Sequence, residues 1–507
     1  MGRSAAERED PALPNASHLC TEDILMEAHG GLQISRRAFI QSLAILFVLM
    51  VLAGILTRVI PSGRFARTTT EGRELIVPGS FEYTARPAYA VWRWFTAPFE
   101  VPFAEGGLTV IVIIVFILLV GGAFAVLDSS GIIRAALAGL VKRFGGRKYL
   151  LLMLITLFFM VLGAFFGIFE EVVPLVPVMV ALSYSLGWDA LVGLGMSILA
   201  TNLGFSAAVA NPFTIGVAQK LAGLPLFSGA WLRLVIFAVV YAILAAFLAA
   251  YARRIERDPS ASPLHGQDAA ERRKYQLPLG ESIAGSRRMG RAMAWFLGAT
   301  LLILVVLIAS PIVPALSDLA LPLVGIIFLI GGVGAGLLSG AGGRNVLAGL
   351  ARGVVNILPA VPLILMAVSV KHIVVQGGIM DTILFAASRP FAAASPFLAA
   401  LLIYGLALVI EFFVASGSAK AFLMMPILLP LADLIGVTRQ VTVTAYCFGD
   451  GFSNLVYPTN PVLLICLGLT VVSYPKWLRW SLGLWMWILL ATIGFLGLAV
   501  AIGYGPF

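Results

Sequence analysis

The stretch Thr201-Asn202-Leu203-Gly204-Phe205-Ser206, followed by Asn211-Pro212, puts polar and helix-breaking residues inside an apolar segment. Asp450-Gly451-Phe452-Ser453-Asn454, followed by Thr459-Asn460-Pro461, does the same in the second half. Pro177 and Pro426 are separated by the same number of residues as the two Asn-Pro pairs, and so are Gly187 and Gly436. Matching breaks in two halves of a membrane protein are typical of a transporter's binding site.

Composition places the chain in the membrane. Of its 507 residues, 60% are hydrophobic and 12% are charged. Apolar runs of roughly 20 residues recur, which is long enough to cross a bilayer. The net charge of +9 comes from basic clusters just outside these runs, as expected of cytoplasmic loops rather than of a nucleic-acid surface. Three scattered cysteines predict neither a disulfide framework nor a CxxC metal site.

The apolar runs and basic clusters predict an all-α polytopic membrane protein of two inverted repeats, with about nine transmembrane helices and two re-entrant hairpins. The hairpins are expected at 149–186 and 394–435, and the broken spans at 190–222 and 440–472. The predicted units are a cytoplasmic N-terminal tail (1–37), the first repeat (38–252), a basic cytoplasmic loop with a linker helix (253–317) and the second repeat (318–507). The polar part of that loop, 253–290, is expected to be flexible, and the C-terminus is expected outside the cell.

Irregular backbone at membrane depth is tolerated where it faces protein or water, so the tips and breaks are expected to meet in the interior. Half-helix termini and neutral polar side chains there suit a small polar solute and a cation. The substrate-binding candidates at the breaks are Asn202, Asn211, Pro212, Thr214, Asn454, Thr459 and Asn460, and the coupling-ion candidates are Thr201, Ser206 and Ser453. The alternative is that the Asn-Pro pairs are simple kinks, which two breaks in register make the weaker interpretation.

Glu170 and Glu171 follow a glycine-rich bend in the first hairpin. A carboxylate in hydrocarbon is costly and usually lines a pathway or pairs with another charge. We expect one of the two to contact the substrate and the other to stabilise a helix start. The alternative is that both are solvated at the membrane interface.

Lys420 follows Ser416, Gly417 and Ser418 at the second tip, and all four are substrate-binding candidates. The lysine is expected to bind a substrate carboxylate, to pair with Glu170 or Glu171, to replace a coupling cation, or to form a structural ion pair. Asp450 is a further candidate for proton or cation coupling. Weaker candidates, divided between pathway and structural roles, are Glu411, Lys371 and His372, and Asp189 is expected to cap a helix.

The chain resembles the YfcC family, a branch of the C4-dicarboxylate anaerobic carrier-like proteins in the ion transporter superfamily. The segments that carry the resemblance include Phe169-Glu170-Glu171, Asn211-Pro212-Phe213-Thr214, Ser416-Gly417-Ser418-Ala419-Lys420-Ala421, Phe448-Gly449-Asp450-Gly451-Phe452 and Pro458-Thr459. The resemblance implies a homodimer in the bacterial inner membrane, whose transport domain moves like an elevator. It also implies amino acids or dicarboxylates as substrates. Ala419-Lys420 replaces the family's usual Gly-Gln, and this added cation favours a carboxylate substrate or coupling without sodium.

The leading hypothesis is a secondary active transporter, an antiporter or symporter, of a small carboxylate-bearing solute, either an amino acid or a C4-dicarboxylate. The alternatives are a sodium- or proton-coupled carrier of another organic anion or a peptide-like solute, a channel, and an intramembrane hydrolase. The hydrolase is disfavoured because Cys447 stands where membrane aspartyl proteases need a glycine. In addition, Ser416 and Lys420 are four residues apart, whereas a serine/lysine dyad has a spacing of three. No enzyme activity, no cofactor and no nucleic-acid partner are expected. Transport is expected to be coupled to Na⁺ or H⁺, and the sequence leaves a metal site undecided.

Overall fold

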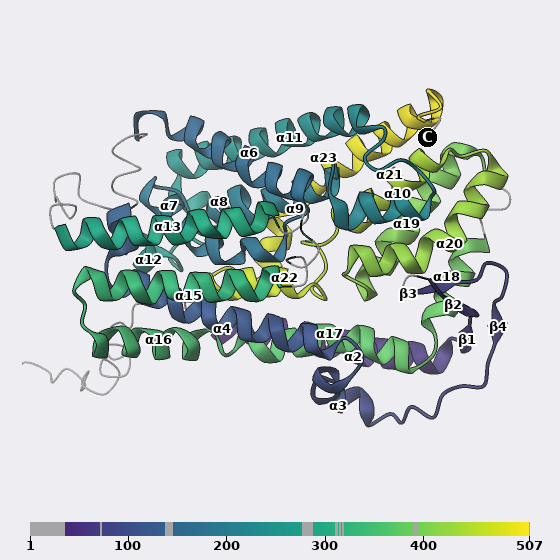
Figure 1. Ribbon diagram of the computed structural model, residues 1–507, viewed down its shortest axis with the longest axis horizontal. Coiled ribbons are helices and arrows are strands. Elements are labelled where there is room, and N and C mark those ends of the chain that lie inside the picture. Colours follow the sequence, from purple (N-terminus) through teal and green to yellow (C-terminus); the bar gives the residue numbers. More distant parts are fainter. Residues whose placement is uncertain are drawn as a thin grey trace, which may run out of the picture.

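The computed structural model describes residues 36–505, apart from 71–72, 137–144, 276–286, 310–312, 314–315, 317–318 and 390–393. The expected tail, 1–37, therefore lies outside the described residues except for its last two positions, which begin the first helix. Most of the described chain is helical, as Figure 1 shows.

Ten helical segments in the described chain are long and apolar enough to cross a membrane. They are α4 (Gly107–Ser129), α6 (Lys148–Phe166), the segment Ala190–Leu221, α11 (Ala230–Arg257), α13 (Arg287–Ala309), α15 (Ala320–Ser339), the segment Gly343–Gln376, α19 (Pro396–Phe413), α20 (Gly417–Ile435) and α23 (Tyr474–Ala501). The first helix, α2 (Arg36–Val59), adds a shorter apolar stretch. The prediction of an all-α polytopic membrane protein is confirmed.

The breaks expected within 190–222, 394–435 and 440–472 are confirmed as interruptions of helix. Ala190–Leu221 consists of α8 (Ala190–Leu194), the π-helix η4 (Gly195–Leu199), α9 (Ala200–Ala207), the π-helix η5 (Pro212–Gly216) and α10 (Val217–Leu221). The second broken segment consists of α21 (Arg439–Gly451) and α22 (Pro461–Gly468). In the first hairpin, α6 is followed by the 3-10 helix η3 (Glu170–Leu175) and α7 (Val176–Ser185), and in the second, residues 414–416 separate α19 from α20. The re-entrant path of these hairpins stays a prediction.

One arm of each hairpin packs along a broken helix, α6 on α9 and α19 on α21. Glycines allow both approaches, because a side chain at Gly204 would meet the Met160 backbone and one at Gly449 would meet the Tyr404 carbonyl. Small residues at such crossings are typical of membrane helices. Other contacts cross between the halves: α20 packs on η5 and α10, and η3 packs on α22. Each hairpin therefore contacts the broken helix of the other half.

A separate row of helices runs beside this unit. α13 packs on α15, α15 on α4, and α4 on α16 (Gly343–Ile357), and Figure 1 shows them side by side. Gly121 and Gly353 bring the backbones of α4 and α16 into contact. The sequence analysis did not identify α16, whose polar face carries Arg344 and Arg352. After it, α17 (Ala360–Gln376) packs on α2, and α18 (Met380–Ser388) leads to α19.

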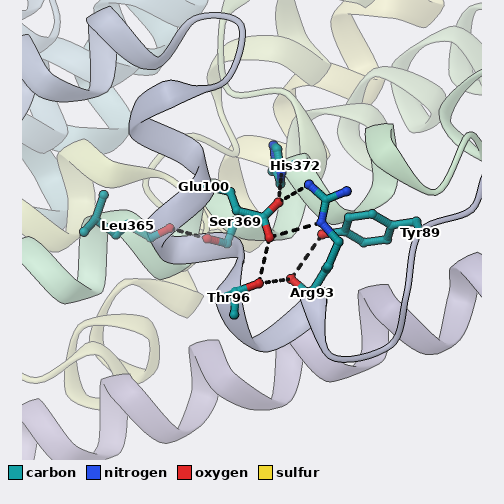
Figure 2. A network of polar contacts seen from close by, with 7 residues as sticks. All are labelled: Tyr89, Arg93, Thr96, Glu100, Leu365, Ser369 and His372. Carbon is teal, nitrogen blue, oxygen red and sulfur yellow. Dashed lines mark hydrogen bonds and ion pairs between the residues drawn. The ribbon is translucent and has the colours of Figure 1, made fainter.

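The segment between α2 and α4 contains two short antiparallel pairs, β1 (Gly63–Arg64) with β4 (Glu82–Tyr83) and β2 (Arg67–Thr70) with β3 (Arg73–Ile76). It continues into α3 (Arg93–Glu100) and η1 (Val101–Phe103). The Glu100 carboxylate accepts hydrogen bonds from Arg93 at 2.5 Å and from Thr96 at 2.7 Å. His372 of α17 lies 3.4 Å from the same carboxylate, so the network in Figure 2 joins α3 to α17.

The prediction of a flexible loop over 253–290 is wrong for its first part. α11 extends to Arg257 and is followed by η6 (Pro259–Ala261) and α12 (Ala269–Tyr275), which packs on α7. The anchor is Asp189, which caps α8 as expected and also accepts hydrogen bonds from Tyr251 and Ser262. These buried contacts offset the cost of ordering a polar segment. The short η2 (Gly145–Arg147) precedes α6.

Candidate functional site

The two Asn-Pro pairs are helix N-caps rather than simple kinks. Asn211 Oδ1 accepts hydrogen bonds from the backbone N–H groups of Phe213 at 2.9 Å and Thr214 at 3.3 Å. Asn460 Oδ1 accepts from the Val462 N–H at 3.0 Å. In each pair, the proline occupies the first helical turn, where its missing N–H costs nothing. Each break therefore starts a new half-helix within a buried segment.

The asparagine amides also bond to groups that precede them in the same broken segment. Asn211 Nδ2 donates to the Phe205 carbonyl at 3.4 Å, and Asn460 Nδ2 donates to Asn454 Oδ1 at 3.1 Å. Asn211, Asn454 and Asn460 are all at most 3% exposed. Satisfying both ends of a buried amide fixes its orientation, so these breaks are built features of the fold.

The second tip docks onto the first break. Ser416 caps α20 by accepting from the Ala419 N–H at 3.4 Å. The Ser418 hydroxyl donates to the Phe213 carbonyl at 2.8 Å, and the Tyr446 hydroxyl donates to the Gly417 carbonyl. A side chain at Gly417 would meet Thr214 and Asp450. The structure thus brings the residues of the second tip together with Thr214 and Asp450.

The two carboxylates of the first tip, Glu170 and Glu171, differ in exposure and in hydrogen bonding. Glu171 is half-buried and accepts from the Phe169 N–H at 3.2 Å, so it stabilises the start of η3 as expected of one of the pair. Glu170 is exposed, although Phe169 and Val172 beside it are 4% and 0% exposed. A contact between Glu170 and a solute stays a prediction.

Lys420 lies between two carboxylates. Its Nζ is 2.7 Å from Asp450 Oδ1 and also contacts Glu411 Oε2. The lysine side chain is 0% exposed, and those of Glu411 and Asp450 are 1% and 2% exposed. One role expected of Lys420 was an ion pair with Glu170 or Glu171. That prediction is wrong, because Lys420 pairs with Glu411 and Asp450 instead. Glu411 was only a weak candidate, although a carboxylate in the apolar helix α19 was signal enough to rank it higher.

The neutral candidates are buried, and most are bonded locally. The hydroxyls of Thr201, Ser206 and Ser453 each donate to the backbone carbonyl four residues earlier. The Asn202 amide differs, because it is 0% exposed and makes no hydrogen bond within the described structure. Thr459 is 7% exposed and its hydroxyl is likewise unsatisfied there. Such groups cost free energy unless a polar partner reaches them.

Two further points limit the chemistry of the site. Among the described residues, no three His, Cys, Asp or Glu side chains are grouped as metal ligands. His372 belongs to the network at α3 (Figure 2), which assigns it a structural contact rather than one with the breaks.

The chain is similar to known proteins over most of its length. The profile of the DcuC family, described as C4-dicarboxylate anaerobic carrier, matches residues 39–501. A relative in Escherichia coli K12, named "Putative basic amino acid antiporter YfcC", is 29% identical, with 88% of this chain and 93% of the relative covered. An uncharacterised protein of Haemophilus influenzae is 25% identical, with 87% and 93% covered.

Two solved structures are also similar. The YdaH transporter of Alcanivorax borkumensis is 18% identical with a TM-score of 0.39, covering 92% of this chain and 100% of that one. MtrF of Neisseria gonorrhoeae, whose structure is described as illuminating a class of antimetabolite efflux pumps, is 17% identical with a TM-score of 0.42, covering 91% and 95%.

The helical fold and the family together define a multi-pass membrane transporter rather than an enzyme. The chain belongs to the C4-dicarboxylate anaerobic carrier family, and its likeness to YfcC over most of its length agrees with the resemblance found from the sequence.

Proposed function

We propose that this chain is a secondary active transporter of a small carboxylate-bearing solute, an amino acid or a C4-dicarboxylate, in a bacterial inner membrane. The observation that carries the proposal is the meeting of the second hairpin tip with the capped break of the first half, at Ser418 and Phe213. A tip that docks on a buried half-helix terminus is the arrangement that carriers use at the bilayer midplane. The family and the name of the YfcC relative support transport of these solute classes.

The solute's carboxylate is assigned to the N-terminus of α20, where free N–H groups attract anions. Ser416 lies there and is exposed, and Gly417 and Ser418 are half-buried, so a solute can reach the terminus. The exposed Glu170 of the first tip suits an ammonium group, which an amino acid has and a dicarboxylate lacks. Lys420 is fully engaged by two carboxylates, so we assign it to coupling rather than to the solute.

The rest of the proposed site is made of the buried neutral groups at the breaks. The unsatisfied amide of Asn202 and the hydroxyl of Thr459 have spare hydrogen-bonding capacity for a polar solute or a bound water. The remaining members of the proposed set are Glu171, Asn211, Pro212, Thr214, Asn454 and Asn460 for the solute, and Thr201, Ser206 and Ser453 for the coupling ion.

Two inverted halves that move as an elevator, within a homodimer, complete the proposal. The reciprocal packing supports the inverted halves, because α20 lies on η5 and α10 while η3 lies on α22. The row α13, α15, α4 and α16 packs largely within itself, as a scaffold would. The distribution of basic loops favours a cytoplasmic N-terminus and a C-terminus on the opposite side.

Counterflow in proteoliposomes tests the proposal. Vesicles with the purified chain are loaded with arginine, glutamate, succinate or fumarate and diluted into the radiolabelled solute. We expect saturable uptake of at least one solute, absent from empty vesicles. A lack of counterflow for every solute of a broad amino-acid and dicarboxylate panel would contradict the proposal, and an ohmic current without saturation would identify a channel instead.

A further inference from the structure

The buried group formed by Glu411, Lys420 and Asp450 is unbalanced in charge. One ammonium lies between two carboxylates, so the group carries one net negative charge when all three are ionised. The three side chains are at most 2% exposed. An uncompensated buried charge is strongly destabilising even in a relaxed protein. The fold therefore favours the arrival of one positive charge at this group.

Among the side chains that the structure describes, the surroundings do not supply that charge. On α21, the nearest titratable side chains are Tyr446, whose hydroxyl donates to the Gly417 carbonyl, and the buried thiol of Cys447. On α11, Arg233 faces Cys447, but its guanidinium donates to the Val209, Phe227 and Ser228 carbonyls and to the Tyr504 hydroxyl. Of the other described side chains on elements packed on α20, α10 contributes Lys220, which is exposed, α18 contributes Asp381, which pairs with Arg67, and η5 contributes the neutral Thr214. On α17 and α23, which pack on α19, Lys371 and Arg479 are exposed, His372 contacts Glu100 and Lys476 donates to Gln267.

The group lies directly beneath the second tip. Ser416 and Ala419 are exposed, whereas Lys420 next to them is buried. Gly417 lies between the exposed tip and the carboxylate, since a Cβ added there would be 2.9 Å from Asp450 Oδ2. Because Gly417 has no side chain, only its backbone separates the surface of the tip from Asp450.

We propose that Glu411 and Asp450, bridged by Lys420, bind one proton in each transport cycle, which makes the proton the coupling ion. In the binding step, a hydrated proton forms an O–H bond with one carboxylate oxygen and leaves its water behind, while Lys420 keeps its charge. The group then becomes neutral. Sodium is disfavoured because the Lys420 ammonium already occupies the position between the carboxylates that a cation would take. The inference rests on the proposed function, for which it specifies the coupling.

The same contacts connect proton binding to the tip. Lys420 belongs to the first turns of α20, whose start is held by Tyr446 at Gly417 and by Ser418 at Phe213. A protonated carboxylate attracts the ammonium less, so α20 loses part of its attachment to α19 or α21. The position of the tip against the first break then depends on the protonation state.

Infrared spectroscopy tests proton binding without any solute. Detergent-purified full-length chain is acidified from about pH 8 to about pH 5, the range in which a coupling group must titrate, and the C=O stretch of protonated carboxylic acid is recorded. Glu411→Gln and Asp450→Asn should each remove one band that the wild type gains. Asp433→Asn, which changes an exposed carboxylate of α20 that pairs with Arg439 of α21, is the matched control and should keep the band. Spectra of the two variants that equal the wild type over this range would overturn the proposal.

Glu411→Gln is also suited to transport measurements, because it has the charge of the protonated group and leaves Lys420 paired with Asp450. In proteoliposomes, a pH difference of about one unit should drive up to about tenfold accumulation of a solute coupled to one proton. The ratio of pH-driven accumulation to counterflow should fall to about one-tenth in this variant and stay unchanged in Asp433→Asn. Wild-type accumulation driven by sodium and insensitive to pH would overturn proton coupling. Absent counterflow would contradict the proposed function, while the infrared result would still decide whether the group binds a proton.

Discussion

The Ser418 hydroxyl donates a hydrogen bond to the Phe213 carbonyl at 2.8 Å, although the two residues are 205 positions apart in sequence. Phe213 belongs to the second half-helix of the first break, and Ser418 belongs to the first turn of α20. This bond is the direct link between the second hairpin tip and the broken helix of the other half. A motion of the tip during transport must break it or carry both elements together.

Removing this link should impair transport more than folding. Ser418→Ala leaves a half-buried carbonyl without its donor, which costs about 1 kcal/mol. We expect a several-fold lower counterflow rate and a melting temperature within a few degrees of the wild type. Ser388→Ala, which removes a hydroxyl bonded only within α18, is the matched control and should leave counterflow unchanged. Equal counterflow in the two variants would show that the link is dispensable.

A second prediction concerns Gly417. A methyl group at this position would lie 2.7 Å from the Thr214 methyl and 2.9 Å from Asp450 Oδ2, so the tip must move away from the first break. Gly417→Ala should reduce counterflow at least tenfold. Gly405→Ala is the control, because a Cβ there meets nothing within 4 Å and Ala is the better helix former by about 1 kcal/mol. The control should melt at or above the wild-type temperature with normal counterflow. Wild-type counterflow in Gly417→Ala would refute the close approach of tip and break.

Much of this architecture could be predicted from the sequence. Helix breaks at membrane depth need residues that cannot continue a helix, so Asn211-Pro212 and Asn460-Pro461 indicated them directly. The cap at Asp189 was also predictable, because a short acidic side chain after Gly187-Trp188 suits the start of a helix. These features depend on local chemistry, which the sequence contains.

Features that depend on long-range contacts were harder to predict. The partners of Lys420 could not be chosen from the sequence, since Glu170, Glu171, Glu411 and Asp450 are all acidic residues in apolar surroundings and only packing selects among them. Ordering of the polar segment after α11 depends on Ser262 reaching Asp189, which lies 73 positions earlier. Local composition does not encode such a contact.

The asparagine caps should contribute to both stability and transport. Replacing an N-cap asparagine by alanine costs about 1 kcal/mol, and more where the lost acceptor leaves buried N–H groups unsatisfied. Asn211→Ala and Asn460→Ala should each lower the melting temperature by a few degrees and counterflow by at least tenfold. Asn211→Asp and Asn460→Asp keep the capping oxygen, so they should melt closer to the wild type. The prediction is checked by thermal denaturation followed by tryptophan fluorescence. Equal melting of the alanine and aspartate variants would show that capping is not the role of these residues.

The network around Glu100 in Figure 2 predicts a pH-dependent contribution to stability. Its hydrogen bond to Arg93 lowers the pKa of Glu100 to about 2, against an ordinary value of 4.5. A lowered pKa means that the stabilisation is present above about pH 4.5 and is lost as the pH falls toward 2. Because Arg93 and Glu100 are 35% and 22% exposed, solvent screening reduces the effect to about 1 kcal/mol.

Glu100→Gln should therefore lower the melting temperature by a few degrees at neutral pH, and the difference from the wild type should shrink as the pH falls from about 4.5 toward 2, the range over which the carboxylate becomes protonated in the unfolded and then in the folded chain. Glu82→Gln, an exposed carboxylate in β4, is the control and should melt like the wild type throughout. Thermal denaturation of the purified chains between about pH 3 and about pH 8 provides the measurement. If the difference between Glu100→Gln and the wild type does not depend on pH, the carboxylate contributes through packing or neutral hydrogen bonds rather than through its charge.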